Sequence, residues 1–439
     1  MMRLNSYEYQ SNIKKHNWNI LLFVLCVASL TLNGLHNPVI NTVAFLGTIV
    51  YVLFAPKDNS LLVYPIVFIF MGFSNLTMNI VGGTLDISTA ANIIYLLMLI
   101  KLLYCNHVIK IYNGTGLYFL VLVICSLNIL VTNKLSQAIF LVAKMFIIYH
   151  ILSKLNEEKE ENTEKIFTHK FIMALLIAIV GEVIYGVLFP VASTSGTWRA
   201  VQFGGVKDPN NLSLHCCLLF AIAVILNPEA VSKPLKRFIA IFMPLIVFAS
   251  ISFTGITMIS VLLIIGLNKQ LNGTKKVIAI FIFSIIAIAA SFINYSSLLS
   301  TLTNSNQSTV AAFAQRLNLM LTQYKTGNYE RLTSGRTALW IDYYTSFKAG
   351  NMATKLFGNA GYMNELVKIY GIASHNIYID FLISYGIVGI LFITLMLLSN
   401  WKNKIIKKSW DNIFVNLIFA ITFFSRTFDL SVFGLYVLL

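Results

Sequence analysis

The chain has 439 residues, of which 57% are hydrophobic and only 11% are charged. A soluble domain of average composition has about 25% charged residues, so this composition argues against an ordinary soluble globular protein and is typical of a membrane protein. The net charge of +15 is spread through short segments between apolar runs rather than gathered in a basic patch, which argues against a nucleic-acid-binding protein.

Sequence motifs for metal, nucleotide or disulfide chemistry are missing from the chain. The five cysteines lie within or at the ends of apolar runs, where we expect them to act as small core residues. No D-x-D or H-E-x-x-H motif and no clustered His or Cys occurs in the segments predicted to be external. No phosphate-binding loop of the Walker type occurs either. We therefore expect no metal, no ATP and no other cofactor.

Apolar runs near the ~20 residues that span a bilayer recur along the whole chain and predict an all-α polytopic membrane protein with about 13–14 transmembrane helices. The predicted spans are 18–34, 39–55, 61–81, 86–104, 116–133, 135–153, 166–190, 210–227, 236–252, 254–268, 276–295, 374–398 and 411–425, followed by a half-length segment from position 429. The first run lacks a small-residue cleavage site, so we expect it to remain as a span rather than to be removed as a signal peptide.

Basic residues set the predicted orientation. Lys and Arg gather near the N-terminus and in the short loops on the same side of the predicted spans, so the positive-inside rule places the N-terminus in the cytoplasm. The predicted organisation is a first set of eleven spans in 1–295, a large external loop in 296–373 and C-terminal spans in 374–439. A loop of that length is usually functional, and it shares its side of the membrane with the shorter loop 191–209.

Two amphipathic helices are predicted within the large loop, over "TVAAFAQRLNLMLTQY" and "SGRTALWIDYYTSF", with Ser334 as the N-cap of the second. Arg336 then falls in the first turn of that helix, where a cation opposes the helix dipole unless an anion binds there. Arginine is suited to bidentate phosphate contacts, so Arg336 and the nearby Arg331 are candidates for binding a phosphate-bearing substrate. The alternative is that both are ordinary exposed loop arginines.

A second candidate anion site lies in the shorter loop, in the segment "RAVQFGGVKDPNN". Arg199 lies in a stretch that is otherwise rich in Gly, Ser and Thr, and Lys207 adds a cation just before a predicted span. We expect Asp208 and Asn210 to cap the start of that span rather than to take part in chemistry.

The strongest acid–base candidate is His375, at the start of "SHNIYIDFLISYGIVGI". The ordinary imidazole pKa of about 6.5 lets histidine accept a proton near neutral pH. The alternative is a polar residue that caps the helix. Further along the same predicted span, we expect Gly386 and Gly389 to let a neighbouring helix approach closely.

Several ionisable residues are predicted to lie deeper in the membrane. Lys144 and Glu182 fall at similar depth on adjacent spans and predict a structural ion pair, with an ion or proton relay as the alternative. Four others, which could line a polar cavity open to the outside, are His215, Asp380, Arg426 and Asp429.

In the order "SGRTALW", "LFGNAGY" and "SHNIYIDFLISYGIVGI", the chain resembles the O-antigen polymerase and O-antigen ligase superfamily, the Wzy and WaaL proteins of bacteria. The family pattern has an Arg and a Trp on a helix of a large periplasmic loop, a Gly-x-x-Gly turn, and His-Asn opening a span with glycines further along. The segment "RAVQFGGVKDPNN" is similar to the family's upstream segment. The matched stretches are short, and the predicted topology agrees over most of the chain.

The resemblance implies a metal-independent, inverting glycosyltransferase of GT-C-like architecture in the bacterial inner membrane, with its active site facing the periplasm. Its donor and acceptor would be glycans linked to undecaprenyl pyrophosphate. Carried over to this chain, Arg336 and Arg199 would bind the donor pyrophosphate, and His375 would orient or deprotonate the acceptor hydroxyl. The residues that would support substrate binding are Arg331, Lys207, Asn376, Tyr378, Trp340 and Arg426.

Polymerase and ligase differ in the acceptor, which is another lipid-linked repeat unit for a polymerase and lipid A-core or a protein for a ligase. Divergence outside the core motifs favours a polymerase of O-antigen or capsular polysaccharide, and such an enzyme could bind a chain-length-regulating co-polymerase. Two other classes of protein are the alternatives. One is a flippase or secondary transporter for lipid-linked oligosaccharides, favoured by Lys144 and Glu182, and the other is a non-catalytic scaffold.

Overall fold

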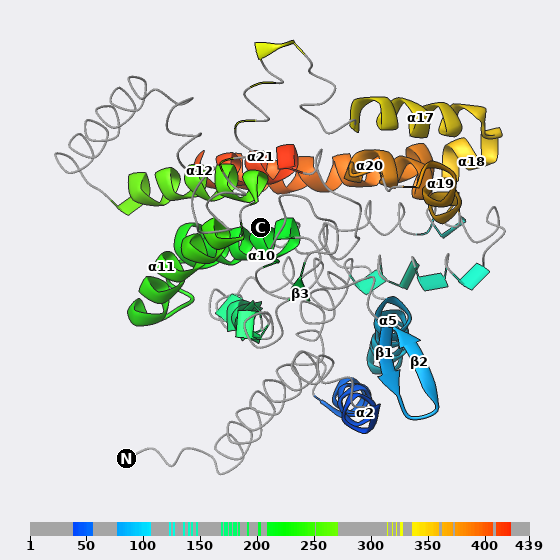
Figure 1. Ribbon diagram of the computed structural model, residues 1–439, viewed down its shortest axis with the longest axis horizontal. Helices are drawn as coiled ribbons and strands as arrows, with labels where there is room; N and C mark the ends of the chain where they lie inside the picture. The colour runs from blue at the N-terminus through cyan, green and yellow to red at the C-terminus, as the bar shows by residue number, and fades with distance from the viewer. Residues whose placement is uncertain are drawn as a thin grey trace.

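The computed structural model describes residues 38–55, 77–106, 191–192, 201–202, 209–250, 252–270, 336–359, 362–371, 374–406 and 410–422, with short runs and single positions between 123 and 184 and between 314 and 327. Most of these residues are helical, as the apolar periodicity predicts. Figure 1 shows two groups of helices, one around the green helices and one along the orange helix.

The first described elements form a helix–hairpin–helix unit. Helix α2 (Pro38–Phe54) and helix α5 (Ile87–Asn106) pack against each other, and the hairpin of β1 (Thr77–Ile80) and β2 (Gly83–Asp86) leads directly into α5. Two hydrogen bonds attach the hairpin to the start of α2, from Asn41 Nδ2 to the carbonyl of Asn79 and from the N–H of Val81 to the Thr42 hydroxyl. The hairpin therefore lies at the amino ends of both helices.

A lysine joins the carboxyl ends of the same two helices. The Lys101 ammonium, on α5, is buried and donates to the backbone carbonyls of Val52, at 2.6 Å, and Ala55 at the end of α2. These carbonyls carry the negative end of the helix dipole and have no partner within the helix, so a cation stabilises them. Because the hairpin lies at the opposite ends, α2 and α5 run parallel.

The hairpin corrects one predicted span. Residues 77–80 were predicted to end the apolar span 61–81, and they form β1 instead. Two consecutive glycines, Gly82 and Gly83, supply the positive φ angles that a tight hairpin turn needs, and this local signal outweighs the apolar periodicity. A second small antiparallel pair, β3 (Val191–Ala192) with β4 (Val201–Gln202), joins the two ends of the segment that carries Arg199.

The centre of the molecule is helix α10 (Pro209–Phe220), which continues into the π-helical turn η1 (Ala221–Leu226). Every residue from Leu212 to Ile225 is buried, in a stretch that contains no Lys, Arg, Asp or Glu. A helix that is apolar on all sides is stable only when it is surrounded. Helices α11 (Lys233–Ala249), α12 (Phe253–Gln270) and α21 (Trp410–Thr422) pack against α10 or η1.

A close approach of α10 and α12 depends on Gly255. A Cβ atom at this position would lie 2.3 Å from the Cβ of Ser213, so no larger residue fits without a shift. The hydroxyl of Ser213 forms a 2.6 Å hydrogen bond with that of Ser250, so both buried hydroxyls have a partner within the core. Small residues thus let the helices pack at short distance.

The C-terminal group is arranged along helix α20 (Ile377–Ile406), and Figure 1 shows α17 (Arg336–Ala349), α18 (Met352–Phe357) and α19 (Tyr362–Tyr370) beside one part of it. α20 consists of two helical segments that meet at Gly386, whose φ of 67° and ψ of −162° are not helical. Helix α21 packs on α20 and links this group to α12.

Most of the predicted helical segments that fall in the described residues are helices in the structure. Those confirmed as helices are 39–55, 86–104, 210–227, 236–252, 254–268, 374–398 and 411–425, and α17 confirms the second amphipathic helix of the large loop. The predicted spans 18–34 and 276–295, positions 61–76 of the predicted span 61–81 and the half-length segment from 429 lie outside the described residues, and only short runs and single positions are described in 116–190. Within the part of the chain that the structure describes, no helix combines the length and the apolar composition needed to cross a bilayer.

Candidate active site

The candidate site lies where α17 meets the start of α20. Helix α17 begins at Arg336, so the arginine does occupy the first turn, and its side chain is half-buried. One turn later, the indole N–H of Trp340 donates a hydrogen bond of 2.8 Å to the backbone carbonyl of Ser374. Residues four positions apart lie on the same face of a helix, so Arg336 and Trp340 both belong to the side of α17 that meets this segment.

A small apolar cluster holds α17 in this position. Apolar residues on one face of α17 pack against α19 and α20, including the first turn of α20. The buried members are Tyr343, Leu366 and Ile383, with Leu339, Phe347, Tyr370 and Ile379 packed around them. The spacing of Leu339, Tyr343 and Phe347, four residues apart, explains why this segment forms a helix with a defined inner face.

The residues before α20 form a tight polar turn. The N–H of Asn376 donates to the Ser374 hydroxyl oxygen at 3.0 Å, and the side-chain oxygen of Asn376 accepts from the N–H groups of Tyr378, at 3.0 Å, and Ile379. Asn376 is therefore the N-cap of α20. The alternative role predicted for His375 was to cap the helix, and the structure gives that role to its neighbour Asn376 instead.

His375 lies between these two anchored residues and is half-exposed. Its φ of 52° makes it the one non-glycine residue with positive φ in the described ranges. Histidine tolerates this left-handed region better than most residues, but the conformation still costs about 1–2 kcal/mol. Such strain persists where the surroundings enforce it, and it often accompanies a functional residue.

A buried carboxylate lies beneath the turn. Asp380, in the first turn of α20, is 3% exposed, and one of its oxygens accepts a hydrogen bond from the Ser374 hydroxyl, which is itself fully buried. Burial raises the pKa of Tyr343 to about 12, and the nearby Asp380 and Tyr370 contribute to that rise.

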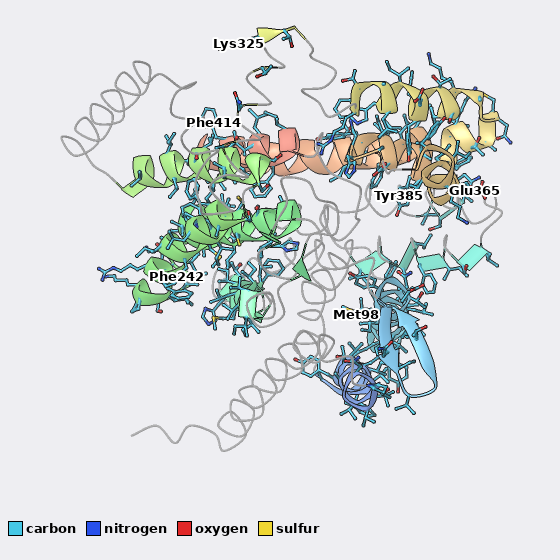
Figure 2. All side chains as sticks on the ribbon, viewed as in Figure 1. Met98, Phe242, Lys325, Glu365, Tyr385 and Phe414 are labelled. Atoms are coloured by element: carbon cyan, nitrogen blue, oxygen red, sulfur yellow. The ribbon has the colours of Figure 1, made fainter. Side chains whose placement is uncertain are left out.

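A break in α20 lies against the end of α18. The sequence "LFGNAGY" places Gly358 at the end of α18, where a Cβ would lie 2.3 Å from the backbone N of Tyr385. The N–H of Asn359 donates at 2.9 Å to the carbonyl of Ile383, which the break at Gly386 frees from helical pairing. Figure 2 shows the side chains where α19 and α20 meet, with Glu365 and Tyr385 labelled. The expected close approach at Gly386 is thus confirmed, and its partner is the backbone of α18.

Three residues predicted to support a substrate already use polar atoms within the protein. The Trp340 indole binds Ser374, the Asn376 oxygen caps α20, and the Tyr378 hydroxyl donates at 2.9 Å to the carbonyl of Ala420 on α21. Their contact with a substrate stays a prediction. The contacts seen here assign them a structural role, which is to hold the turn around His375.

Other predicted residues are not placed by the structure. Arg199, Lys207, Arg331 and Arg426 lie outside the described residues. The same holds for the predicted ion pair of Lys144 and Glu182, for Ser334 as a cap and for Asp429. The structure therefore joins the two motifs on either side of "LFGNAGY" through the Trp340–Ser374 contact, with Arg336 on the helix of Trp340 and His375 next to Ser374.

The predicted open polar cavity is corrected for two of its members. His215 is 2% exposed on α10, and Asp380 is 3% exposed on α20, so neither side chain faces an open space. The apolar stretch around each residue agrees with its burial within the protein, but burial alone does not reveal a cavity.

Sequence reasoning did not assign roles to Ser374 and Tyr343. The signal for Ser374 was present, because a hydroxyl residue two positions before an N-cap commonly accepts a hydrogen bond from the chain that follows. Tyr343 carried no such signal, since an aromatic residue on an inner helical face reads as an ordinary core residue.

No protein-family model, curated protein or solved structure matches the chain.

Proposed function

We propose that this chain is a bacterial polysaccharide polymerase, a glycosyltransferase that transfers a growing glycan from undecaprenyl pyrophosphate to a lipid-linked repeat unit. The observation that carries the proposal is the Trp340–Ser374 hydrogen bond, which spans 34 positions of the sequence. It joins the helix that begins at Arg336 to the turn that holds His375. This contact between the two motifs that carry Arg336 and His375 supports the proposal.

The chemistry needs a cation for the leaving group and a base for the incoming hydroxyl. A diphosphate ester is already a good leaving group once its developing negative charge is neutralised, and a guanidinium does this without a metal ion. Arg336 supplies that charge, with Arg199 and Arg331 as further donors. His375 accepts the proton of the acceptor hydroxyl as that oxygen attacks the anomeric carbon and the carbon–oxygen bond to the diphosphate breaks, with inversion.

Outward apolar faces support a bilayer as the protein's surroundings. Helix α11 buries Ile239, Met243 and Val247 on one side and exposes large apolar residues on the other, namely Phe238, Ile241, Phe242, Leu245 and Phe248. Helix α2 exposes a stripe at spacings of three and four residues, formed by Val39, Val43, Leu46, Val50 and Leu53. Helices that are apolar on both sides need an apolar environment. We place the protein in the inner membrane with a cytoplasmic N-terminus and a periplasmic site.

The test is complementation of a deletion strain, with surface glycans and lipid-linked intermediates analysed side by side. The variants are Arg336→Ala and His375→Asn, because asparagine tolerates positive φ and removes only the imidazole. The matched control is Lys348→Ala, which removes an exposed cation from the last turn of the same helix. We expect the deletion to leave single repeat units, the wild type and the control to restore the ladder, and the two site variants to fail.

Other outcomes would redirect the assignment. Polymer that accumulates unattached on the lipid carrier in the deletion strain would indicate a ligase, and single repeats held on the cytoplasmic side would indicate a transporter. Full ladders with both site variants would show that Arg336 and His375 are not catalytic. Release of the protein from membranes by alkaline carbonate would contradict its placement as an integral membrane protein.

A further inference from the structure

Ser374 is held by several hydrogen bonds that leave its turn little freedom. Its carbonyl accepts from the Trp340 indole, and its hydroxyl oxygen accepts from the N–H of Asn376. Its hydroxyl proton faces two acceptors, a carboxylate oxygen of Asp380 and, at 3.2 Å, the carbonyl of Asn376, and the Asp380 contact is the shorter. Ser374 and Asp380 are both buried, at 0% and 3% exposure. A buried hydrogen bond to a carboxylate is among the stronger ones that a hydroxyl can make.

The conformation of His375 is the feature that these bonds explain. A left-handed non-glycine residue is unfavourable by itself, and it is retained only where the flanking residues are fixed. Here the preceding residue is tied to Asp380 and to α17, and the following residue caps α20. The backbone of His375, from which the imidazole extends, is therefore fixed on both sides.

The position of Asp380 suits a carboxylate that accepts a hydrogen bond from the Ser374 hydroxyl. Burial of a carboxylate is unfavourable unless it is hydrogen-bonded or otherwise compensated. Asp380 lies in the first turn of α20, where the positive end of the helix dipole favours an anion, and the Ser374 hydroxyl points at it. It lies beneath the turn, whereas His375 is half-exposed above it.

We propose that Asp380 is a positioning residue for His375, acting through the Ser374 hydroxyl to hold the imidazole in the orientation that receives the acceptor's proton. This inference rests on the proposed function, in which His375 is the base. Asp380 itself transfers no proton to or from the substrate. Because a small displacement of a catalytic group is enough to slow a reaction about 100-fold, loss of this contact lowers kcat rather than substrate affinity.

The experiment uses the full-length protein in nanodiscs and lipid-linked repeat units extracted from the deletion strain. The variants are Asp380→Ala, Asp380→Asn and Ser374→Ala, each also combined with His375→Asn. We expect Asp380→Ala and Ser374→Ala to lower kcat about 10- to 100-fold with KM within twofold of wild type. Asp380→Asn keeps an acceptor oxygen for Ser374 and should recover most of the rate.

The combined variants distinguish positioning from general support of the fold. If Asp380 acts through His375, adding Asp380→Ala to His375→Asn leaves the residual rate unchanged, because the effects of residues in one unit are not additive. A further loss of more than about fivefold would overturn the proposal. The control is Ser346→Ala, which removes a hydroxyl contact with Tyr370 in the same group of helices and should leave kcat unchanged.

A measurement that does not depend on catalytic activity tests the positioning role of Asp380 separately from the proposed function. Hydrogen–deuterium exchange of the 374–380 peptide should become faster in Asp380→Ala and in Ser374→Ala, and not in His375→Asn. Full activity of His375→Asn would refute the proposed base and the positioning role with it. An inactive His375→Asn beside an active Asp380→Ala with unchanged exchange would overturn the positioning role alone. If Asp380→Ala fails to reach the membrane, Ser374→Ala carries the same test.

Discussion

The indole of Trp340 and the carbonyl of Ser374 form a 2.8 Å hydrogen bond that connects the large loop to the start of α20. The contact joins the helix that carries Arg336 to the turn that holds His375. Because Trp340 is one helical turn from Arg336 and Ser374 is adjacent to His375, a change at this bond affects both candidate catalytic residues.

Replacement of Trp340 by phenylalanine tests this bond directly. Trp340→Phe keeps an aromatic ring but leaves the Ser374 carbonyl without its donor, so we expect a loss of about 1 kcal/mol in the free energy of unfolding and a shorter glycan ladder. Thermal unfolding of the purified protein and the complementation gel measure the two effects. Tyr344→Phe, at an exposed position of the same helix, is the control. Unchanged stability and an unchanged ladder would show that the bond is dispensable.

The break in α20 predicts a strong effect at Gly386. A Cβ at this position would lie 2.4 Å from the carbonyl oxygen of Leu356, and the backbone occupies a region open almost only to glycine. We expect Gly386→Ala to lower the free energy of unfolding by about 2–5 kcal/mol. Gly371→Ala is the matched control, since Gly371 also has a positive φ, of 72°, but nothing lies within 4 Å of its Cβ position. Equal losses in the two variants would mean that the contact with α18 does not matter.

The N-cap of α20 is testable by a pair of substitutions. Asn376→Ala removes the oxygen that accepts from Tyr378 and Ile379, and we expect it to lower the free energy of unfolding by about 1 kcal/mol. Asn376→Ser keeps a capping oxygen and should recover most of that loss. Thermal unfolding measures both variants. Alanine and serine variants of equal stability would refute the capping role.

Tyr343 makes the stability of the protein depend on alkaline pH. The pKa of this phenol is raised to about 12 in the folded protein, whereas an unfolded tyrosine ionises near 10. Below pH 10 both states are neutral and nothing changes; between pH 10 and 12 only the unfolded chain loses the proton, so stability falls as pH rises. The apparent melting temperature should drop less steeply over this range in Tyr343→Phe than in the wild type. Identical slopes would contradict the raised pKa.

Much of the helical architecture follows from the sequence because its cause is local. Long apolar runs predict α2, α5, α11 and α12 within a few residues of their observed bounds, the run 210–227 covers α10 with η1, and α20 extends eight residues beyond its predicted end. Arg336 was correctly expected in the first turn of a helix, since the pattern around it repeats every three to four residues. The hairpin at β1 and β2 shows the limit of this reasoning, because apolar composition in 61–81 hid the turn formed by Gly82 and Gly83.

The sequence alone determined the helical class, most helix positions and the pair of motifs that contain Arg336 and His375. Only the tertiary structure decided that Trp340 joins these motifs, that Asn376 caps α20 and that Asp380 holds Ser374 beneath His375. The physical reason is that helix formation depends on neighbours within a few positions, whereas these side-chain contacts depend on packing between segments distant in the chain. The break at Gly386 belongs to the second kind, because it is the backbone of α18 that requires it.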